Sequence, residues 1–130
     1  FYKDVGYGFY CTNLEKQAKR WALTKKHGHV VNVYSYTKDD SLNTLVFNEM
    51  TDEWLDFVVD CRRGKTHNYD CVEGPMADDT IWNYVDDFVR GLITREAFWE
   101  LVKFKYPTHQ IVFCTEESLK QLCFERSYSL

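Results

Sequence analysis

The chain has 130 residues, with 20 acidic against 16 basic side chains and a formal net charge of −4. This length suits one domain with a core of its own, and the acidic balance argues against a sequence-independent nucleic-acid surface, which needs clustered positive charge. The five cysteines are odd in number and lack Cys-x-x-Cys spacing, so they indicate neither a disulfide framework nor a zinc site.

No signal peptide is visible, and no apolar run approaches the roughly 20 residues that a membrane span needs. We therefore expect a cytoplasmic protein with reduced, mostly buried thiols and no membrane association. Nine phenylalanines, nine tyrosines and four tryptophans would supply a core and, in addition, an aromatic-lined cleft.

The first predicted elements follow two closely spaced glycines, Gly6 and Gly8, which allow a sharp turn or a close approach to a ligand. Residues 9–11 then predict a short strand of aromatic and small side chains. Thr12 and Glu15 have the spacing of a capping box, and the apolar periodicity behind them predicts a helix over 13–27. A turn, a strand and a helix N-terminus would thus lie close together, where a planar ligand with phosphates could bind.

The middle of the chain predicts a hairpin and a helix. Residues 29–37 alternate and are rich in β-branched and aromatic side chains, and residues 44–48 form a second strand that we expect to be its partner. Thr51 is a typical N-cap for a helix that buries Trp54 and its neighbours and ends near residues 62–64.

The last part of the chain predicts a strand over 69–73, helices over 79–90 and 95–105, a strand over 110–114 and a short helix after Thr115. There is no repeat, low-complexity tract or linker. Strands and helices in irregular order favour one α+β domain over residues 1–130.

The opening motif resembles the second motif of ADP-ribosyltransferases, the NAD-consuming fold of the poly(ADP-ribose) polymerases and diphtheria toxin. The polymerases carry Gly-x-Gly-(Ile/Leu)-Tyr-Phe-Ala and then a helix with a second tyrosine. Here Gly6, Gly8, Phe9 and Tyr10 match that pattern, and Trp21 falls on the second aromatic position.

The sequence is more similar still to a family of small bacterial ADP-ribosyltransferase-like domains of unknown function. That family reads Asp-Phe-Gly-x-Gly-Phe-Tyr-x-Thr and then Gln-Ala-x-x-Trp-Ala. The matching segments here are residues 4–12, 17–22, 54–58, 62–64, 69–72, 74–75 and 110–113. The resemblance therefore covers nearly the whole chain, and it is specific as a set.

The resemblance implies a split, mostly antiparallel sheet surrounded by helices, with NAD as a substrate and no metal. It places Gly8, Phe9, Tyr10 and Trp21 at the dinucleotide. Tyr10 would stack on nicotinamide, or it packs into the core as an ordinary strand residue. Trp21 would form the opposing wall, or it belongs to the apolar stripe of its helix. Ala18 replaces a serine that in the polymerases binds the nicotinamide amide.

Gln110 is the implied catalytic residue. It opens Gln110-Ile111-Val112-Phe113, which resembles the polymerase strand Glu-Tyr-Ile-Val-Tyr, whose glutamate holds the ribose and stabilises the oxocarbenium-like charge. A glutamine can hydrogen-bond the ribose but brings no negative charge. Polymer extension is therefore disfavoured, and mono-ADP-ribosylation and a catalytically silent fold both stay open. The alternative is a polar residue that merely starts a strand.

Other polar residues have plainer interpretations. Glu116 and Glu117 suit the first turn of a helix after Thr115. Arg62 and Arg63 could bind a phosphate, or they are solvated at a helix C-terminus. Among the four histidines, only His109 stands beside a candidate catalytic residue.

The chain begins with Phe1, and the resemblance implies that the first strand of the fold, with its histidine-glycine motif, precedes that point. The expected function is transfer of ADP-ribose from NAD to an unidentified protein or nucleic acid, by a bacterial toxin that a small partner protein would neutralise. Two rivals stay open, namely a non-catalytic NAD- or nucleotide-binding module and a protein-interaction domain.

Overall fold

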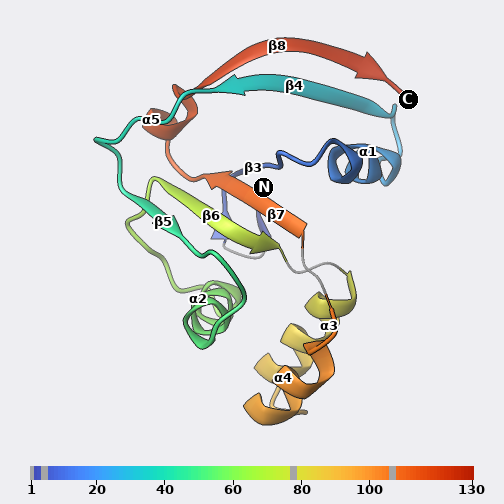
Figure 1. Cartoon of the computed structure of the whole chain (residues 1–130), viewed down its shortest axis with the longest axis vertical. Helices are drawn as coiled ribbons and strands as arrows, with labels where there is room; N and C mark the ends of the chain where they lie inside the picture. The colour runs from blue at the N-terminus through green and yellow to red at the C-terminus, as the bar shows by residue number, and fades with distance from the viewer. Residues whose placement is uncertain (1, 4–5, 77–78, 106–107) are drawn as a thin grey trace.

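The central sheet has four strands in the order β3-β7-β6-β5. In the computed structural model, which describes residues 2–3, 6–76, 79–105 and 108–130, these strands span Phe9–Cys11, Thr108–Phe113, Cys71–Met76 and Thr44–Val46. β7 runs antiparallel to both β3 and β6, whereas β5 runs parallel to β6. The architecture is α+β, as predicted, with a mixed central sheet (Figure 1).

A second sheet pairs β4 (Val30–Tyr36) with β8 (Leu122–Ser129), and β1 (Tyr2–Lys3) pairs with β2 (Gly6–Tyr7). The β4–β8 pair covers one face of the central sheet (Figure 1). Edge-to-face ring contacts join the two layers, with centroids 5.7 Å apart for Phe9 and Tyr34 and again for Phe113 and Tyr36. Helix α1 (Glu15–Leu23) packs against β4 on the same side.

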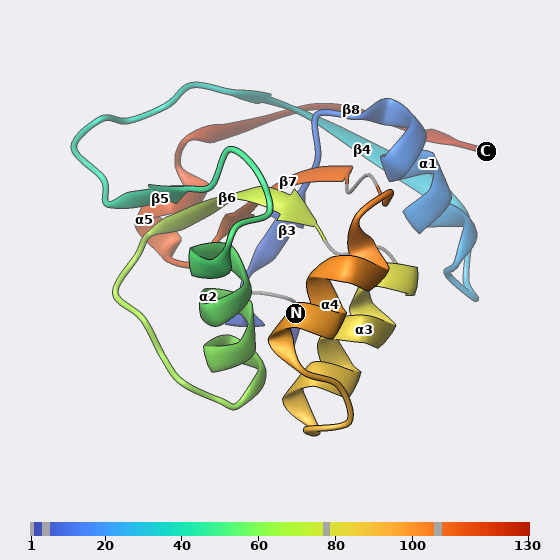
Figure 2. The same cartoon turned by 60° about the horizontal axis from the view of Figure 1, so that its bottom comes forward.

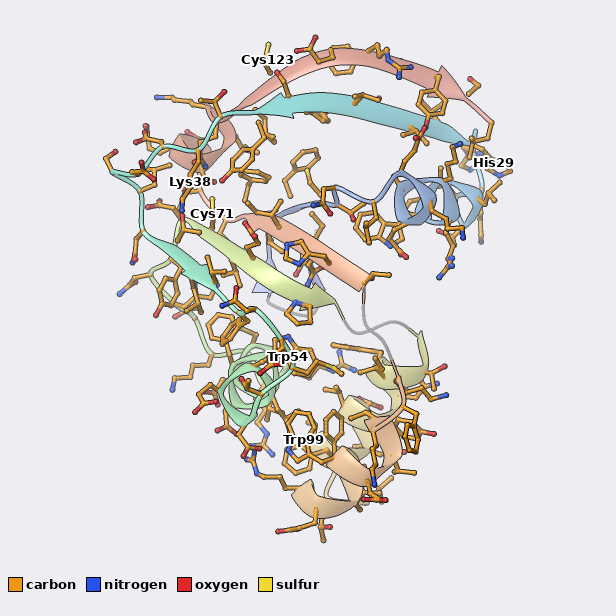
Figure 3. The ribbon with its side chains drawn as sticks, in the orientation of Figure 1. His29, Lys38, Trp54, Cys71, Trp99 and Cys123 are labelled. Carbon is orange, nitrogen blue, oxygen red and sulfur yellow. The ribbon has the colours of Figure 1, made fainter. Side chains whose placement is uncertain are left out.

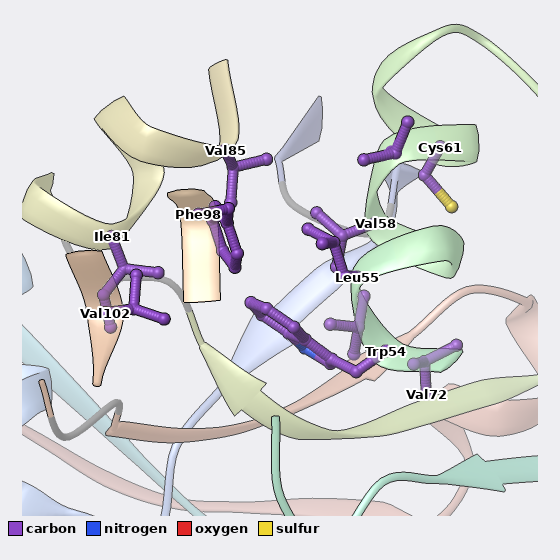
Figure 4. Packing of buried hydrophobic residues seen from close by; sticks show 11 residues of the cluster. Trp54, Leu55, Val58, Cys61, Val72, Ile81, Val85, Phe98 and Val102 are labelled. Carbon is purple, nitrogen blue, oxygen red and sulfur yellow. The ribbon is translucent and has the colours of Figure 1, made fainter. Parts of the chain in front are cut away.

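The opposite face of the sheet carries three helices: α2 (Asp52–Arg62), α3 (Asp79–Val89) and α4 (Arg95–Val102) (Figure 2). Their apolar sides meet Val72 of β6 and Val112 of β7 in the main core. Trp54 lies at its centre with 1% of its surface exposed, and its indole Nε1 donates to the Pro75 carbonyl at 3.1 Å (Figure 4). The face of β3 and β7 that carries Tyr10 and Val112 therefore packs against α2, α3 and α4.

Threonine N-caps were predicted correctly for three helices, although not for α1. The hydroxyls of Thr51, Thr94 and Thr115 accept the backbone N–H of residues 54, 97 and 118, at the starts of α2, α4 and the short helix α5 (Glu116–Leu119). At α5 the Ser118 hydroxyl also accepts from the Thr115 N–H, which completes a capping box.

The capping box predicted for Thr12 and Glu15 was wrong. Helix α1 begins at Glu15 after Leu14, which makes no side-chain cap, and it ends at Leu23 rather than near residue 27. The Thr12 hydroxyl instead donates to the His109 carbonyl at 2.8 Å and accepts from the Leu14 N–H. A contact with β7 therefore replaces the local cap.

The predicted hairpin of 29–37 with 44–48 was also wrong. β4 pairs with β8 at the end of the chain, and β5 pairs with β6 in parallel. β8 was not predicted as a strand, because most of its side chains are exposed and their pattern does not alternate. Within the described residues, no helix combines the length and the apolar character required to cross a membrane.

Candidate functional site

Tyr10 and Gln110 lie on adjacent strands of the central sheet and on the same face of it. Tyr10 is paired with Val112, and Gln110 stands two residues before Val112 on β7. Side chains two apart on a strand share a face, and diagonal neighbours of this kind are separated by about 7–8 Å in regular sheets. Two of the residues that the resemblance assigns to NAD, Tyr10 and Gln110, are therefore neighbours.

Their shared face is the one that carries α2, α3 and α4. Tyr10 is half-buried and packs against the main core, so the core-packing interpretation of Tyr10 describes its surroundings, and stacking on nicotinamide stays a prediction. Trp21 lies on α1, which packs against β4 on the other side of the sheet. The aromatic clamp of Tyr10 and Trp21 stays a prediction as well.

Gln110 is buried, with 2% of its surface exposed. Its partner across the strand pair is Gly74 of β6. A Cβ at Gly74 would lie 3.0 Å from Phe47 Cβ and 3.1 Å from the Phe47 carbonyl oxygen, so the chain just after β5 packs closely against Gly74. The carboxamide thus lies beneath the surface and is not displayed on it.

Strand β7 leaves no room for a side chain at Gly8. A Cβ at Gly8 would lie 2.5 Å from Val112 Cγ1 and 3.1 Å from the Phe113 carbonyl oxygen. This close approach of the bend at Gly8 to β7 explains the glycine without a ligand. Phe9 faces the other side of the sheet and packs on Tyr34, as the predicted alternation with Tyr10 requires.

A cavity of about 380 Å³ opens at the end of β6 and β7, next to Gln110 in the chain. It is lined by Asn48, Glu49, Met50, Pro75, Thr108 and His109. The Thr108 hydroxyl oxygen is buried and has no hydrogen-bond partner among the described residues. His109 Nε2 lies 3.2 Å from Glu73 Oε2, which places a carboxylate directly behind the imidazole.

Sequence reasoning singled out His109 for its position beside Gln110, but it missed Glu73 and residues 48–50. Glu73 meets His109 only through the register of β6 against β7, in which Gly74 faces Gln110. Residues 48–50 reach the cavity because β5 lies alongside β6. Neither relationship leaves a local signal in the sequence.

Several charged candidates have structural roles. Arg62 Nη2 binds Asp86 Oδ1 at 2.9 Å, and its guanidinium lies 4.9 Å from the centroid of the Trp82 ring, so Arg62 joins α2 to α3. Glu116 and Glu117 occupy the first turn of α5, as predicted.

The thiols and metal-binding side chains offer no alternative centre in the described parts of the chain. Burial raises the pKa of the Cys11, Cys61 and Cys114 thiols to about 11, which disfavours a thiolate nucleophile. No group of three or more His, Cys, Asp or Glu side chains that could hold a metal ion occurs among the described residues.

Comparison with known proteins gives a family without a function. The model of a family described as "Protein of unknown function (DUF3990)" matches residues 1–124. No curated protein and no solved structure matches the chain.

Proposed function

We propose that this chain, which belongs to the DUF3990 family, is a mono-ADP-ribosyltransferase-like domain that uses NAD as its substrate. The bond from the nicotinamide ring nitrogen to ribose C1′ breaks, and its electron pair leaves with nicotinamide. A nucleophile on a protein or nucleic-acid acceptor forms a new bond to C1′ and loses one proton. The function rests on the residues that carry the resemblance, since the family itself has no assigned activity.

The observation that carries the proposal is the pairing of β3 with β7. It places Tyr10 and Gln110 on one face, one diagonal step apart, although the two residues are separated by nearly the whole chain. A stacking ring beside a ribose-binding side chain would hold nicotinamide and its ribose in one orientation for cleavage. A cavity lined in part by Thr108 and His109 begins one residue from Gln110 in the chain.

Gln110 would act by hydrogen bonding alone. Its carboxamide accepts from a ribose hydroxyl and orients the sugar, but it cannot offset the positive charge that develops at C1′ as a carboxylate would. The chemistry therefore relies on nicotinamide as a leaving group that is already activated by its own charge. Slow transfer of a single ADP-ribose is the expected outcome, with no metal involved.

A second candidate function is a binding module that retains NAD without cleaving it. The burial of Gln110, at 2% exposure, and its lack of charge favour this candidate. The resemblance also extends the proposal to a bacterial cytoplasmic toxin with a small neutralising partner protein, an extension that rests on family analogy.

The test incubates the chain with NAD labelled in nicotinamide and measures both NAD binding and nicotinamide release. Gln110→Ala should abolish release. Gln121→Ala is the matched control, because Gln121 is also a buried glutamine but bonds Cys71 Sγ and the Ser118 carbonyl. Binding without release would establish the binding module, and the absence of NAD binding in the folded chain would overturn both candidates.

A further inference from the structure

The cavity at the end of β6 and β7 is lined by polar and charged side chains to which the proposed function gives no role. We propose that it holds the guanidinium group of an arginine side chain. This assignment rests on the proposed function, and it identifies the ADP-ribose acceptor as a protein that presents an arginine side chain. The volume of about 380 Å³ is in the range of ligand sites, which usually begin near 300 Å³.

The charge around the cavity selects for a cation. Glu49 lines the cavity, and Glu73 lies behind His109 at 3.2 Å. None of the described lining residues is a lysine or an arginine. A pyrophosphate would be repelled by these carboxylates, so the cavity is not the phosphate site of a dinucleotide.

The polar atoms of the lining fit a guanidinium in particular. This group presents five N–H donors and no acceptor. The lining offers the Glu49 carboxylate, the Asn48 amide oxygen and the Thr108 hydroxyl, whose oxygen is buried without a partner among the described residues. A planar nicotinamide ring has far fewer donors and would leave these acceptors unsatisfied.

The apolar part of the lining suits the stem of an arginine. Met50 and Pro75 supply surface against which three methylene groups can pack while the charged head binds the carboxylate. The Pro75 carbonyl is already bonded to Trp54 Nε1 at 3.1 Å, which fixes this wall against α2.

During transfer, a guanidinium nitrogen bonds to ribose C1′ as the bond from C1′ to nicotinamide breaks. The guanidinium loses one proton in this step. The imidazole of His109, held by Glu73, accepts that proton and passes it to water.

The binding test needs no NAD. Methylguanidinium is titrated into the full chain and followed by amide NMR, with neutral methylurea as the isosteric probe. We expect weak, saturable binding that shifts residues 48–50 and 108–109 and that Glu49→Gln weakens at least threefold. Glu53→Gln is the control, because Glu53 is an exposed carboxylate of the first turn of α2 outside the cavity. Equal binding of methylurea, or binding indifferent to Glu49→Gln, would overturn the cation site.

The role as an acceptor site is tested separately. An arginine peptide should accelerate nicotinamide release and become ADP-ribosylated, and a matched lysine peptide should do neither. Modification of the two peptides at equal rates would overturn the arginine assignment. If methylguanidinium binds in the cavity but the chain never releases nicotinamide, the proposed function and the acceptor role fall and the cation site stands.

Discussion

Tyr10 of β3 and Gln110 of β7 share one face of the central sheet, because Tyr10 pairs with Val112 and Gln110 lies two residues before it. That face is covered by α2, α3 and α4, and only 2% of Gln110 is exposed. The side chain that the resemblance assigns to catalysis therefore lies in an environment that opposes charge.

Replacing Gln110 with glutamate tests this environment. Desolvation should raise the pKa of the new carboxyl in the folded state. The variant should therefore keep its folding stability below the unfolded-state pKa and lose stability as the pH rises through the folded-state pKa. We expect urea unfolding to show a loss of about 3–4 kcal/mol at pH 8, equivalent to a pKa rise of roughly two to three units, and a clearly smaller loss at pH 5. Gln110→Met is the uncharged control. Equal losses at both pH values would mean that position 110 is open to solvent.

Gly8→Ala tests whether Gly8 serves the packing of β3 on β7. The new methyl group would meet Val112 Cγ1 at 2.5 Å and the Phe113 carbonyl oxygen at 3.1 Å, so we expect a loss of about 1–3 kcal/mol in the free energy of unfolding. Val112→Ala removes the nearer obstacle. In a double-mutant cycle the two losses should then be less than additive. Strict additivity would show that β7 does not constrain residue 8.

Local signals in the sequence predicted much of the helical structure. Thr51, Thr94 and Thr115 each cap a helix through a bond to an N–H three residues ahead, a relationship that a short window of sequence contains. The alternation of Phe9 and Tyr10 was predictable for the same reason. The cap predicted at Thr12 was wrong because the Thr12 hydroxyl donates to a carbonyl 97 positions away in the chain.

Long-range pairing was beyond these signals. Val30–Tyr36 and Thr44–Val46 are close in the chain and were the expected partners, since sequential strands often pair. The actual partner of β4 is Leu122–Ser129. The same limit hid Glu73, which reaches His109 only through the register of β6 and β7. Site residues that come together only through such strand pairings can be identified only once the fold is known.

Asp52 should make the chain sensitive to acid. Its Oδ1 accepts from Trp99 Nε1 at 2.8 Å and from Arg95 Nη1 at 3.1 Å. The Trp99 bond first, and then Arg95, hold the pKa of Asp52 below its usual 3.8. A lowered folded-state pKa gives stability that is present above the unfolded-state value and is lost as the pH falls through the folded-state one.

Asp52→Asn should therefore destabilise the chain at pH 7, and its difference from the wild type should shrink on acidification below about pH 4, where the unfolded carboxyl titrates. Urea unfolding from pH 7 down to pH 2.5 measures this difference. Asp40→Asn is the control, because Asp40 is 93% exposed in its side chain and lies 4.0 Å from Lys38. A difference that persists unchanged at the lowest pH would assign the effect of Asp52 to packing.

The thiols should differ sharply in reactivity. Burial raises the pKa of Cys11, Cys61 and Cys114 to about 11, so roughly 0.1% of each is thiolate at pH 8. Burial also raises the pKa of Cys71, the thiol of which lies 3.3 Å from Gln121 Nε2. Cys123, on the exposed outer side of β8, is accessible to a reagent (Figure 3).

A thiol-specific chromogenic reagent at pH 8 should then label one cysteine rapidly, and Cys123→Ser should abolish this rapid phase. Unfolding in denaturant should release the remaining thiols together, whereas a second fast thiol in the native chain would show that the fold admits reagent to the core.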